Sequence, residues 1–530
     1  DIELIKSKLL RNILLIVGSA LIAGIFTFIM RQMLINVSRF IEFDLKNEIY
    51  QKYQSLNFDF YKNNRTGDLM NRISEDVSKV RMYIGPAIMY TITTLSLFII
   101  VITYMVSVAP KLTMYTLTPL PILSFIIYKI SKVINQKSKT VQEYLSKLTS
   151  FTQESFSGVK IIKTYTIGKY INKELSDLAA ASKEKNMSLV KIQAWFFPLM
   201  ILLIGISNII VVYIGGIQYM NGEIELGVLA EFIIYINMLT WPVATVGWVT
   251  SIIQQAEASQ KRINEFLNTK SSIINISNNK LKIDGEIHFK DISLTFKETK
   301  IKALSNISFA IKSGESIALM GDVGSGKSTL LELLCRVYDP DEGEILIDQN
   351  NIKNININEL RNCIGYVPQS TFLFSDSIEN NIKFGKSDAS NYEIVKSAEI
   401  ACLSKDIDLF KNKYNTILGE RGVNLSGGQK QRLAIARAII KKPKILILDD
   451  SLSAVDTETE EKILSSLKDV TKNMTVIIAT HRVSSAKTCD KILVLRNGSI
   501  LEFGSHEDLI KKNGYYSTSY RKQSSEKEII

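Results

Sequence analysis

The sequence predicts an α-helical transmembrane bundle with long cytoplasmic helix extensions, followed by an α/β domain. Two observations predict this division of the 530 residues. Apolar runs crowd residues 9 to 255, whereas the remainder has the mixed composition of a soluble domain. In that remainder, short alternating strand patterns lead into a Gly-rich loop and an apolar-periodic helix. A chain of this length also exceeds what one hydrophobic core organises, so we expect at least two domains.

Five apolar stretches in the first half are long enough to cross a bilayer, which takes about 20 helical residues. They lie near residues 9–35, 84–109, 112–134, 192–220 and 226–256. The fourth has no charged residue at helical spacing, which favours a membrane span over a buried soluble helix. We predict a transmembrane domain over residues 1–266, a polar linker over 267–284 and a second domain over 285–530.

The basic residues gather in the long polar segments between the spans. Segments 31–83 and 129–191 carry about twenty Lys and Arg, and the short segment 215–227 carries none. This asymmetry is typical of the cytoplasmic side of membrane proteins. We therefore place the long helix extensions and the second domain in the cytoplasm. The net charge of +11 then reflects membrane topology, and nucleic acid is not expected as a partner.

The start of the chain conflicts with this topology. Five spans put residue 1 outside, yet Lys6, Lys8 and Arg11 stand just before the first span, where the charge asymmetry favours the cytoplasm. A further span upstream of residue 1 would remove the conflict, and we expect one.

The Gly-rich loop follows an apolar strand at residues 316–320 and precedes a helix. The loop reads Gly321-Asp322-Val323-Gly324-Ser325-Gly326-Lys327-Ser328-Thr329. Its glycines let backbone N–H groups wrap a phosphate, and the helix N-terminus adds a favourable dipole. We expect Lys327 to reach the β- and γ-phosphate oxygens of ATP and Ser328 to ligate Mg²⁺.

A second aliphatic strand, beginning at residue 445, ends in two adjacent acids, Asp449 and Asp450. An acid at this place beside a phosphate-binding loop is typical of a nucleotide site, so we expect Asp449 to hold Mg²⁺ directly or through water. Between the two strands, a Ser-Gly-Gly turn opens the helix of residues 424–440. Such a turn exposes backbone N–H groups to an anion. We infer that it serves an ATP held by another copy of the domain; a simple helix cap is the alternative.

Together these motifs resemble those of ATP-binding-cassette (ABC) exporters, specifically half-transporters that fuse a membrane domain to an α/β P-loop ABC ATPase domain. The resemblance covers essentially the whole chain. It implies that two ATPase domains sandwich two ATP molecules head to tail, and that Ser426, Gly427, Gly428 and Gln429 contact the γ-phosphate of the opposite ATP. It also assigns four further roles: Gln369 as a link between Mg²⁺ and the membrane domain, Ser453–Asp456 as a loop that contacts the other domain, His481 as the switch residue near the γ-phosphate, and Phe296 in place of the usual adenine-stacking Tyr.

Asp450 departs from the family pattern, which has Glu at this position to orient the attacking water. Asp is one methylene shorter, and a misplacement of about 1 Å can lower a rate on the order of 10²-fold. We expect ATP binding to survive with slow hydrolysis. Two assemblies remain open: a heterodimer, in which this site is the degenerate one, and a homodimer, in which both sites use Asp450 with His481.

Other features of the resemblance concern the membrane half. Residues 60–77 and 154–170 resemble cytoplasmic coupling segments that dock on the ATPase domain, with a plain interhelical loop as the alternative. The family bundle has six spans, so the resemblance implies that the first span lies upstream of residue 1. The charge argument leads to the same expectation.

The resemblance implies ATP-driven export of a hydrophobic or amphipathic substrate, a drug-like compound or a lipid, by alternating access. The expected location is a bacterial inner or plasma membrane. An ATP-gated channel or regulatory subunit with poor hydrolysis is the alternative, because of Asp450, and a peptide exporter is another. Several large side chains could line a substrate cavity, although ordinary packing explains such residues more often: Trp195, Phe196, Phe197, Met200, Met238, Trp241 and Trp248.

Overall fold

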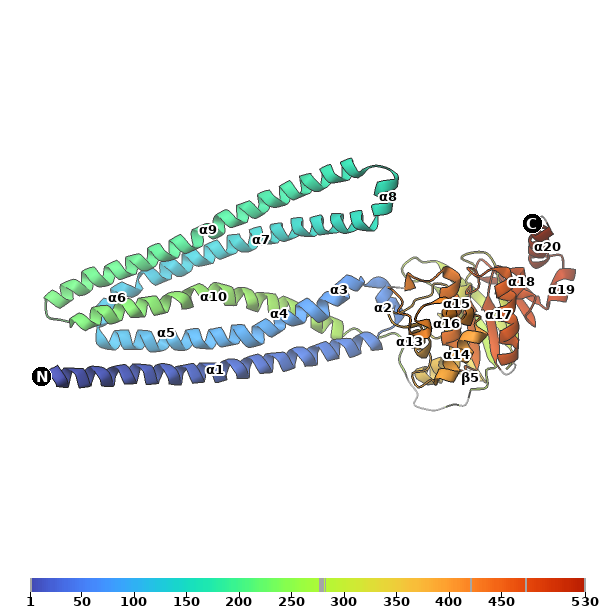
Figure 1. Ribbon diagram of the computed structural model, residues 1–530, viewed down its shortest axis with the longest axis horizontal. Coiled ribbons are helices and arrows are strands. Elements are labelled where there is room, and N and C mark those ends of the chain that lie inside the picture. The colour runs from blue at the N-terminus through green and yellow to red at the C-terminus, as the bar shows by residue number, and fades with distance from the viewer. Residues whose placement is uncertain (1, 276–280, 282, 420–421, 472–473, 529–530) are drawn as a thin grey trace. The chain divides into compact units, whose positions relative to one another are not determined.

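The structure, a computed structural model, describes residues 2–275, 281, 283–419, 422–471 and 474–528 (Figure 1). Its contacts divide the chain into two compact units. The first unit consists of Asp1–Gln54 and Arg65–Thr269, and the second of Ser55–Asn64 and Lys270–Ile530. The predicted linker at 267–284 lies partly outside the described residues. The short segment 55–64 lies between the two segments of the first unit in the chain, but its contacts assign it to the second unit.

The first unit is built of long helices with shorter helices between them. They are α1 (Ile2–Ser55), α3 (Thr66–Asn71), α4 (Val77–Met82), α5 (Ile88–Val108), α6 (Pro110–Leu117), α7 (Pro119–Ser157), α8 (Val159–Thr164), α9 (Gly168–Met220) and α10 (Leu226–Leu267). Two π-helical turns, η1 (Arg72–Asp76) and η2 (Tyr83–Ala87), flank α4. Helices α7 and α9 run side by side, and α8 joins their ends (Figure 1).

Within the described residues, four helical stretches are long and apolar enough to cross a membrane. They are Ile2–Ser55, Thr66–Val108, Gly168–Met220 and Leu226–Leu267. The predicted span at 112–134 is not among them, because it is divided between α6 and α7. Pro119 stands at the first position of α7, and proline cannot continue the hydrogen-bond ladder of a preceding helix. The number of crossings therefore stays a prediction.

A polar contact and an apolar cluster hold α10 to its neighbours. The buried Asp76 carboxylate of η1 accepts hydrogen bonds from Ser259 Oγ at 2.9 Å and Arg262 Nε at 3.0 Å. Met105 of α5 and Phe232 of α10 are fully buried in one hydrophobic cluster. By contrast, no residue in the most apolar window of α1 is buried. An apolar surface of this extent is typical of a helix that faces lipid.

The second unit contains two sheets. An antiparallel sheet has the strand order β2-β1-β4-β5. Its strands are β1 (Ile287–Thr295), β2 (Lys302–Ile311), β4 (Glu342–Ile347) and β5 (Asn350–Asn351). The larger sheet has the order β10-β9-β3-β8-β7-β6, with β10 antiparallel at one edge and the other strands parallel. Its strands are β3 (Ser316–Met320), β6 (Ile364–Val367), β7 (Ile445–Asp449), β8 (Thr475–Ala479), β9 (Lys491–Arg496) and β10 (Ser499–Gly504).

Helices cover this larger sheet or connect its strands. They are α11 (Lys327–Leu334), α12 (Ile357–Cys363), α13 (Ile378–Lys383), α14 (Asn391–Ile400), α15 (Ser404–Leu409), α16 (Gly427–Ile439), α17 (Thr457–Val470), α18 (Val483–Ala486), α19 (His506–Lys511) and α20 (Tyr515–Glu528). The same unit contains α2 (Phe58–Asn63) and the 3₁₀ turns η3 (Ile352–Asn354) and η4 (Lys413–Asn415). This alternation of parallel strands and helices confirms the predicted α/β class.

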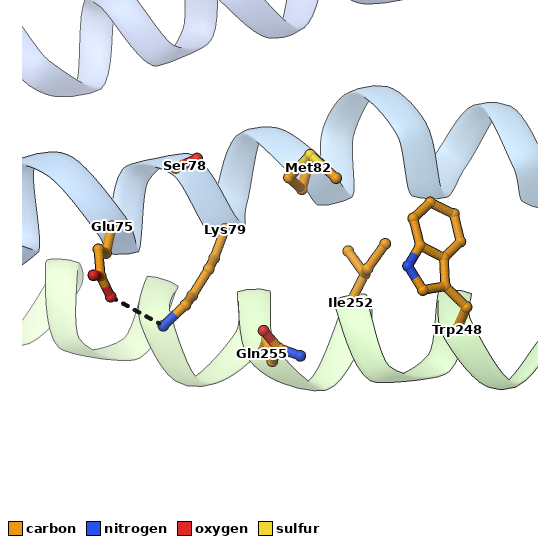
Figure 2. Close-up of a pocket in the computed structure, with 7 residues that line it drawn as sticks. All are labelled: Glu75, Ser78, Lys79, Met82, Trp248, Ile252 and Gln255. Atoms are coloured by element: carbon orange, nitrogen blue, oxygen red, sulfur yellow. Dashed lines mark ion pairs between the residues drawn. The ribbon is translucent and has the colours of Figure 1, made fainter. Parts of the chain in front are cut away.

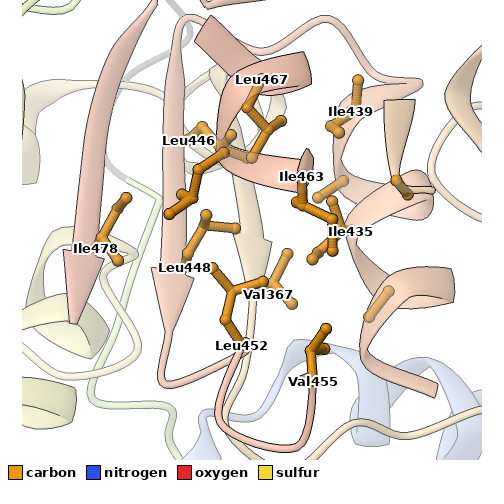
Figure 3. Packing of buried hydrophobic residues seen from close by; sticks show 14 of the residues in the cluster. Val367, Ile435, Ile439, Leu446, Leu448, Leu452, Val455, Ile463, Leu467 and Ile478 are labelled. Atoms are coloured by element: carbon orange, nitrogen blue, oxygen red, sulfur yellow. The ribbon is translucent and has the colours of Figure 1, made fainter. Parts of the chain in front are cut away.

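Both faces of the larger sheet are buried. All five residues of β7 are buried, which explains why the strand is aliphatic throughout. Leu446 and Leu448 belong to one hydrophobic core, in which Figure 3 shows them beside Ile435 of α16 and Ile463 of α17. The alternate residues Ile445 and Ile447 belong to a second core with side chains of β1 and α11. The sheet is therefore anchored from both sides, and its carboxyl edge is a rigid platform for loops.

Candidate nucleotide-binding site

Four groups of predicted site residues lie at one edge of the larger sheet. Strands β3, β8, β7 and β6 are neighbours and run parallel, so their carboxyl ends meet at the same edge. The Gly-rich loop follows β3, His481 follows β8, Asp450 follows β7 and Gln369 follows β6. Segments separated by more than 150 residues in the sequence are thereby brought together.

The Gly-rich loop requires glycine for two different reasons. Gly321, Gly324 and Gly326 have φ angles of +146°, +82° and +100°, which L-residues with a side chain rarely adopt. A Cβ on Gly321 would also lie 2.2 Å from the Leu495 carbonyl oxygen, and one on Gly326 would lie 2.7 Å from that of Ala303. The loop is therefore held closely against neighbouring backbone. This fits a chain that must turn its N–H groups toward an anion.

Lys327 folds back over its own loop. Its Nζ donates to the carbonyl oxygens of Gly321 at 2.8 Å and Asp322 at 2.9 Å, and lies 3.4 Å from Ser325 Oγ. Burial lowers the pKa of the Lys327 ammonium, although the neighbouring Asp450 and Asp449 oppose that shift. The ammonium is thus held by neutral oxygens that a phosphate group would outcompete.

Ser328 and Thr329 lie in the first turn of α11, where the Ser328 hydroxyl contacts Asp449. Ser328 Oγ donates to Asp449 Oδ1 at 3.0 Å, and Tyr366 Oη lies 3.4 Å from Asp449 Oδ2. Asp449 is 3% exposed, and burial raises the pKa of its carboxyl group. In the described part of the chain, hydroxyl groups supply the hydrogen bonds to this buried carboxylate, which leaves its negative charge available to a cation.

The second acid makes contacts of a different kind. Asp450 Oδ1 lies 3.1 Å from His481 Nδ1, and Asp450 Oδ2 accepts from Gln369 Nε2 at 3.4 Å. Its backbone has a φ of +45°, a left-handed conformation that Asp and Asn tolerate better than most residues. Gln369, which is predicted to bind Mg²⁺, thus contacts the Asp450 carboxylate, and its role toward the metal stays a prediction.

The Ser-Gly-Gly turn is a helix cap as well as an exposed turn. Ser426 Oγ accepts from Gln429 N at 3.3 Å, and Gln429 Oε1 accepts from Ser426 N at 2.9 Å, a capping box at the start of α16. A Cβ on Gly428 would lie 3.0 Å from the Ala454 carbonyl oxygen, and one on Gly427 would lie 3.4 Å from Ala454 Cβ. The turn is therefore packed against the loop 453–456.

Phe296 follows β1, and charged and aromatic groups surround its ring. Lys62 Nζ of α2 lies 4.6 Å from the ring centroid. The Tyr338 ring meets Phe296 edge-to-face at a centroid distance of 5.8 Å, and Phe58 of α2 meets Tyr338 in the same way at 6.3 Å. Burial raises the pKa of Tyr338 to about 12. The residue predicted to stack on adenine is thus in direct contact with α2.

Sequence reasoning missed several residues that brace these loops. The Arg482 guanidinium donates to the carbonyl oxygens of Ser453 at 2.8 Å and Val455 at 3.1 Å, and it pairs with the buried Glu460. Gln431 Oε1 accepts from Ala454 N at 3.1 Å. The only sequence signal for Arg482 is its position beside His481. These contacts join the loop 453–456 to the segment that follows β8.

The comparisons with known proteins agree with this geometry. Residues 4–243 match the family described as ABC transporter transmembrane region, and residues 304–453 match the family described as ABC transporter. The chain therefore belongs to the ABC transporters, with an ATP-binding ATPase domain fused to the membrane region, as predicted. It is an integral membrane protein and an exporter half-transporter of the multidrug-resistance-like kind, in which ATP hydrolysis is coupled to transport.

Two groups of relatives are informative. The multidrug resistance-like ATP-binding protein MdlA of Buchnera aphidicola subsp. Baizongia pistaciae is 37% identical over 98% of this chain and 90% of that protein. MdlA of Escherichia coli strain K12 is 32% identical over 95% of this chain and 86% of its own length. Among solved structures, a bacterial Atm1-family ABC exporter with ATP bound is similar with a TM-score of 0.83 and 25% identity, over 97% of this chain and 91% of that one.

Proposed function

We propose that two copies of this chain export an amphipathic compound by binding and hydrolysing ATP at the edge of the larger sheet. The observation that carries the proposal is that the adjacent acids Asp449 and Asp450 each contact a different polar side chain at this edge. Ser328 Oγ lies 3.0 Å from Asp449 Oδ1, and His481 Nδ1 lies 3.1 Å from Asp450 Oδ1. One pair suits a nucleotide-bound cation, and the other suits a water molecule beside the γ-phosphate.

The Gly-rich loop would bind the phosphates of ATP. Its positive-φ glycines leave backbone N–H groups available to the anion, and α11 begins at Lys327. Phosphate oxygens would replace the carbonyl oxygens that now accept from the Lys327 ammonium, because an anion is the stronger partner for a partly buried cation. The lysine would then stabilise the charge that develops during phosphoryl transfer.

Mg²⁺ fits the oxygen atoms of Ser328 and Asp449. Adjacent ligands of an octahedral ion bound at about 2.0–2.1 Å are separated by about 3 Å, and the two oxygens are 3.0 Å apart. Within the described residues, no group of three or more His, Cys, Asp and Glu side chains forms a metal site, which suits an ion whose remaining ligands are water and phosphate. Bound there, the ion would neutralise charge on the β- and γ-phosphate oxygens.

Asp450 and His481 would control the hydrolytic step. The carboxylate would accept a hydrogen bond from the attacking water, and His481 would orient the carboxylate and contact the γ-phosphate. Asp450 is shorter than the usual Glu, so we expect slow hydrolysis. Asp450 contacts both His481 and Gln369 within one chain. This completeness favours a homodimer with two active sites over a degenerate site in a heterodimer.

A second copy would complete each site. The capped turn at Ser426 presents the N-terminus of α16, a helix of 13 residues whose dipole favours an anion. The γ-phosphate bound to one chain would lie against this turn of the other. ATP would thereby join the two ATPase domains, and hydrolysis would release them.

The helix α2 would transmit closure to the membrane region. Its residues Phe58 and Lys62 contact Tyr338 and Phe296 of the ATPase unit. Because α2 lies between α1 and α3 in the chain, a displacement of the ATPase unit is passed directly to two helices of the membrane unit. Docking of residues 154–170, which contain α8, stays a prediction.

The substrate would contact a pocket between α4 and α10 (Figure 2). The pocket has a volume of about 360 Å³ and is lined by Glu75, Ser78, Lys79, Met82, Trp248, Ile252 and Gln255. The Glu75 and Lys79 side chains form an ion pair at 3.9 Å at one end, and Trp248 lies at the other. A pocket with a charged end and an aromatic end suits an amphipathic molecule. Of the predicted cavity residues, Trp248 lines this pocket, whereas the side chains of Phe196, Phe197 and Trp241 lie outside those described.

Transport into inside-out vesicles tests the proposal. Vesicles containing the wild-type chain should accumulate a fluorescent amphipathic cation or lipid when ATP is added, and vesicles containing Lys327→Ala should not. Trp248→Ala should lower the initial transport rate while ATP hydrolysis without substrate is retained. Brisk ATP hydrolysis without transport of any amphipathic compound would contradict export, and equal rates for the Trp248→Ala variant would exclude the pocket.

A further inference from the structure

The side-chain amide of Gln523 forms two hydrogen bonds with the segment that contains His481. Gln523 Nε2 donates to the His481 carbonyl oxygen at 2.9 Å, and Gln523 Oε1 accepts from the Val483 backbone N–H at 2.8 Å. His481 lies in the short connection between β8 and α18, and Val483 is the first residue of α18. The N–H groups of the first helical turn have no partner within their own helix, and here one of them is satisfied from α20.

The segment 481–483 also contacts two neighbouring loops through its side chains. The His481 side chain meets Asp450 at 3.1 Å, and the Arg482 guanidinium bonds the carbonyl oxygens of Ser453 and Val455. A shift of this segment would therefore move the histidine and the loop 453–456 together. The two hydrogen bonds of Gln523 tie this segment to α20.

Helix α20 is itself firmly anchored. The backbone N–H groups of Tyr515 and Tyr516 donate to the Glu502 carboxylate of β10. The side chain of Tyr516 is fully buried, and its Oη lies 2.7 Å from His506 Nδ1. Tyr515 Oη donates to Asp322 Oδ1 of the Gly-rich loop at 2.7 Å. The helix thus contacts both of the loops that the γ-phosphate would meet.

We infer that Gln523 is a positioning residue for ATP hydrolysis, which sets the position of His481 relative to Asp450 through the backbone of residues 481–483. The inference rests on the role proposed above for His481. Gln523 touches neither nucleotide nor water; it acts through the histidine. Its two bonds use the acceptor and a donor of one amide group, so no charged or shorter side chain reproduces both.

The test compares steady-state kinetics of the full-length chain in lipid nanodiscs. Gln523→Ala should lower kcat for ATP hydrolysis by about 10- to 100-fold, because a displacement of about 1 Å at a catalytic group has effects of this order. KM for ATP should stay within about two-fold, since the phosphate-binding loop is unchanged. Lys522→Ala is the matched control, because this exposed neighbour on α20 makes neither bond and should keep the wild-type kcat.

Gln523→Glu gives a second readout that a purely structural role would not move. Its ionised carboxylate still accepts from Val483 N–H but has no proton to donate to the His481 carbonyl, so kcat at neutral pH should be low. Protonation restores a donor, and kcat relative to the wild type should rise as the pH falls toward the usual carboxyl pKa of about 4.3.

Three outcomes decide the matter. A wild-type kcat for Gln523→Ala, with His481→Ala inactive, would overturn the inference and leave the proposed function intact. A parallel loss of kcat, ATP affinity and thermal stability in Gln523→Ala, without pH rescue of Gln523→Glu, would also overturn it, because it would mean that α20 only supports the fold. A fully active His481→Ala variant would refute the proposed role of His481 itself.

Discussion

Lengthening the second acid by one methylene, Asp450→Glu, tests the proposed hydrolytic step. The carboxylate of Asp450 contacts His481 Nδ1 through Oδ1 at 3.1 Å and Gln369 Nε2 through Oδ2 at 3.4 Å. A further methylene would advance it by somewhat more than 1 Å toward the γ-phosphate, and a correction of this size corresponds to about 10²-fold in rate. We expect kcat to rise by about 10- to 100-fold with KM for ATP nearly unchanged, because nucleotide binding does not use this group.

The matched control is Asp450→Asn. Its backbone φ of +45° is tolerated by Asn as well as by Asp, so any loss reflects the carboxylate and not the fold. The purified chain in nanodiscs is assayed for phosphate release at saturating ATP, and thermal melting checks each variant. Asp450→Asn should lose most activity. If Asp450→Glu gains nothing, or if Asp450→Asn hydrolyses ATP as fast as the wild type, then Asp450 does not position the water.

Three other predictions follow from the same contacts. Asp449→Asn should abolish ATP hydrolysis yet raise the melting temperature of the nucleotide-free chain at neutral pH. The pKa of buried Asp449 is raised, so the stability that this carboxyl group contributes is present below about pH 3.9 and is lost as the pH rises through the folded pKa. An unchanged or lower melting temperature would contradict this. Ser426→Ala should destabilise α16 by about 1 kcal/mol through loss of its cap, while Ser465→Ala, at an exposed position of α17, should not. Equal denaturant midpoints for the two variants would refute the cap. Lys62→Met removes the ammonium over Phe296, worth about 0.5–1 kcal/mol, so backbone amides of α2 should exchange with deuterium about two- to five-fold faster, whereas unaltered exchange would mean that the contact does not hold α2.

The architecture and the loops of the site could be predicted because their signals are local. The Gly-rich loop stands between a strand and a helix in the sequence, and the buried strand β7 is a continuous aliphatic run before Asp449. Parallel strands then bring their carboxyl ends to one edge, which needs no long-range information beyond the fold class. The fold class and the fusion of membrane and ATPase regions are accordingly confirmed.

The bracing contacts could not be predicted, because they join distant segments through packing. Gln523 meets a carbonyl 42 residues away, and nothing in its local pattern distinguishes it from other polar residues of a helix. Lys62 contacts Phe296, which lies 234 residues further along the chain. The break between α6 and α7 within residues 112–134 was also not predicted, although Pro119 is a local signal for it. Whether this segment crosses the membrane stays a prediction.

The central claim is that each ATP is held between two polypeptides. It is tested most directly by mixing two inactive variants, Lys327→Ala, whose own phosphate loop is disabled, and Gly427→Asp, whose turn can no longer accept a γ-phosphate. Each alone should be inactive, but random pairing of the two should restore about a quarter of the wild-type ATP hydrolysis, because half of the dimers would have one intact site of two. No recovery on mixing, or full activity of either variant alone, would contradict the account.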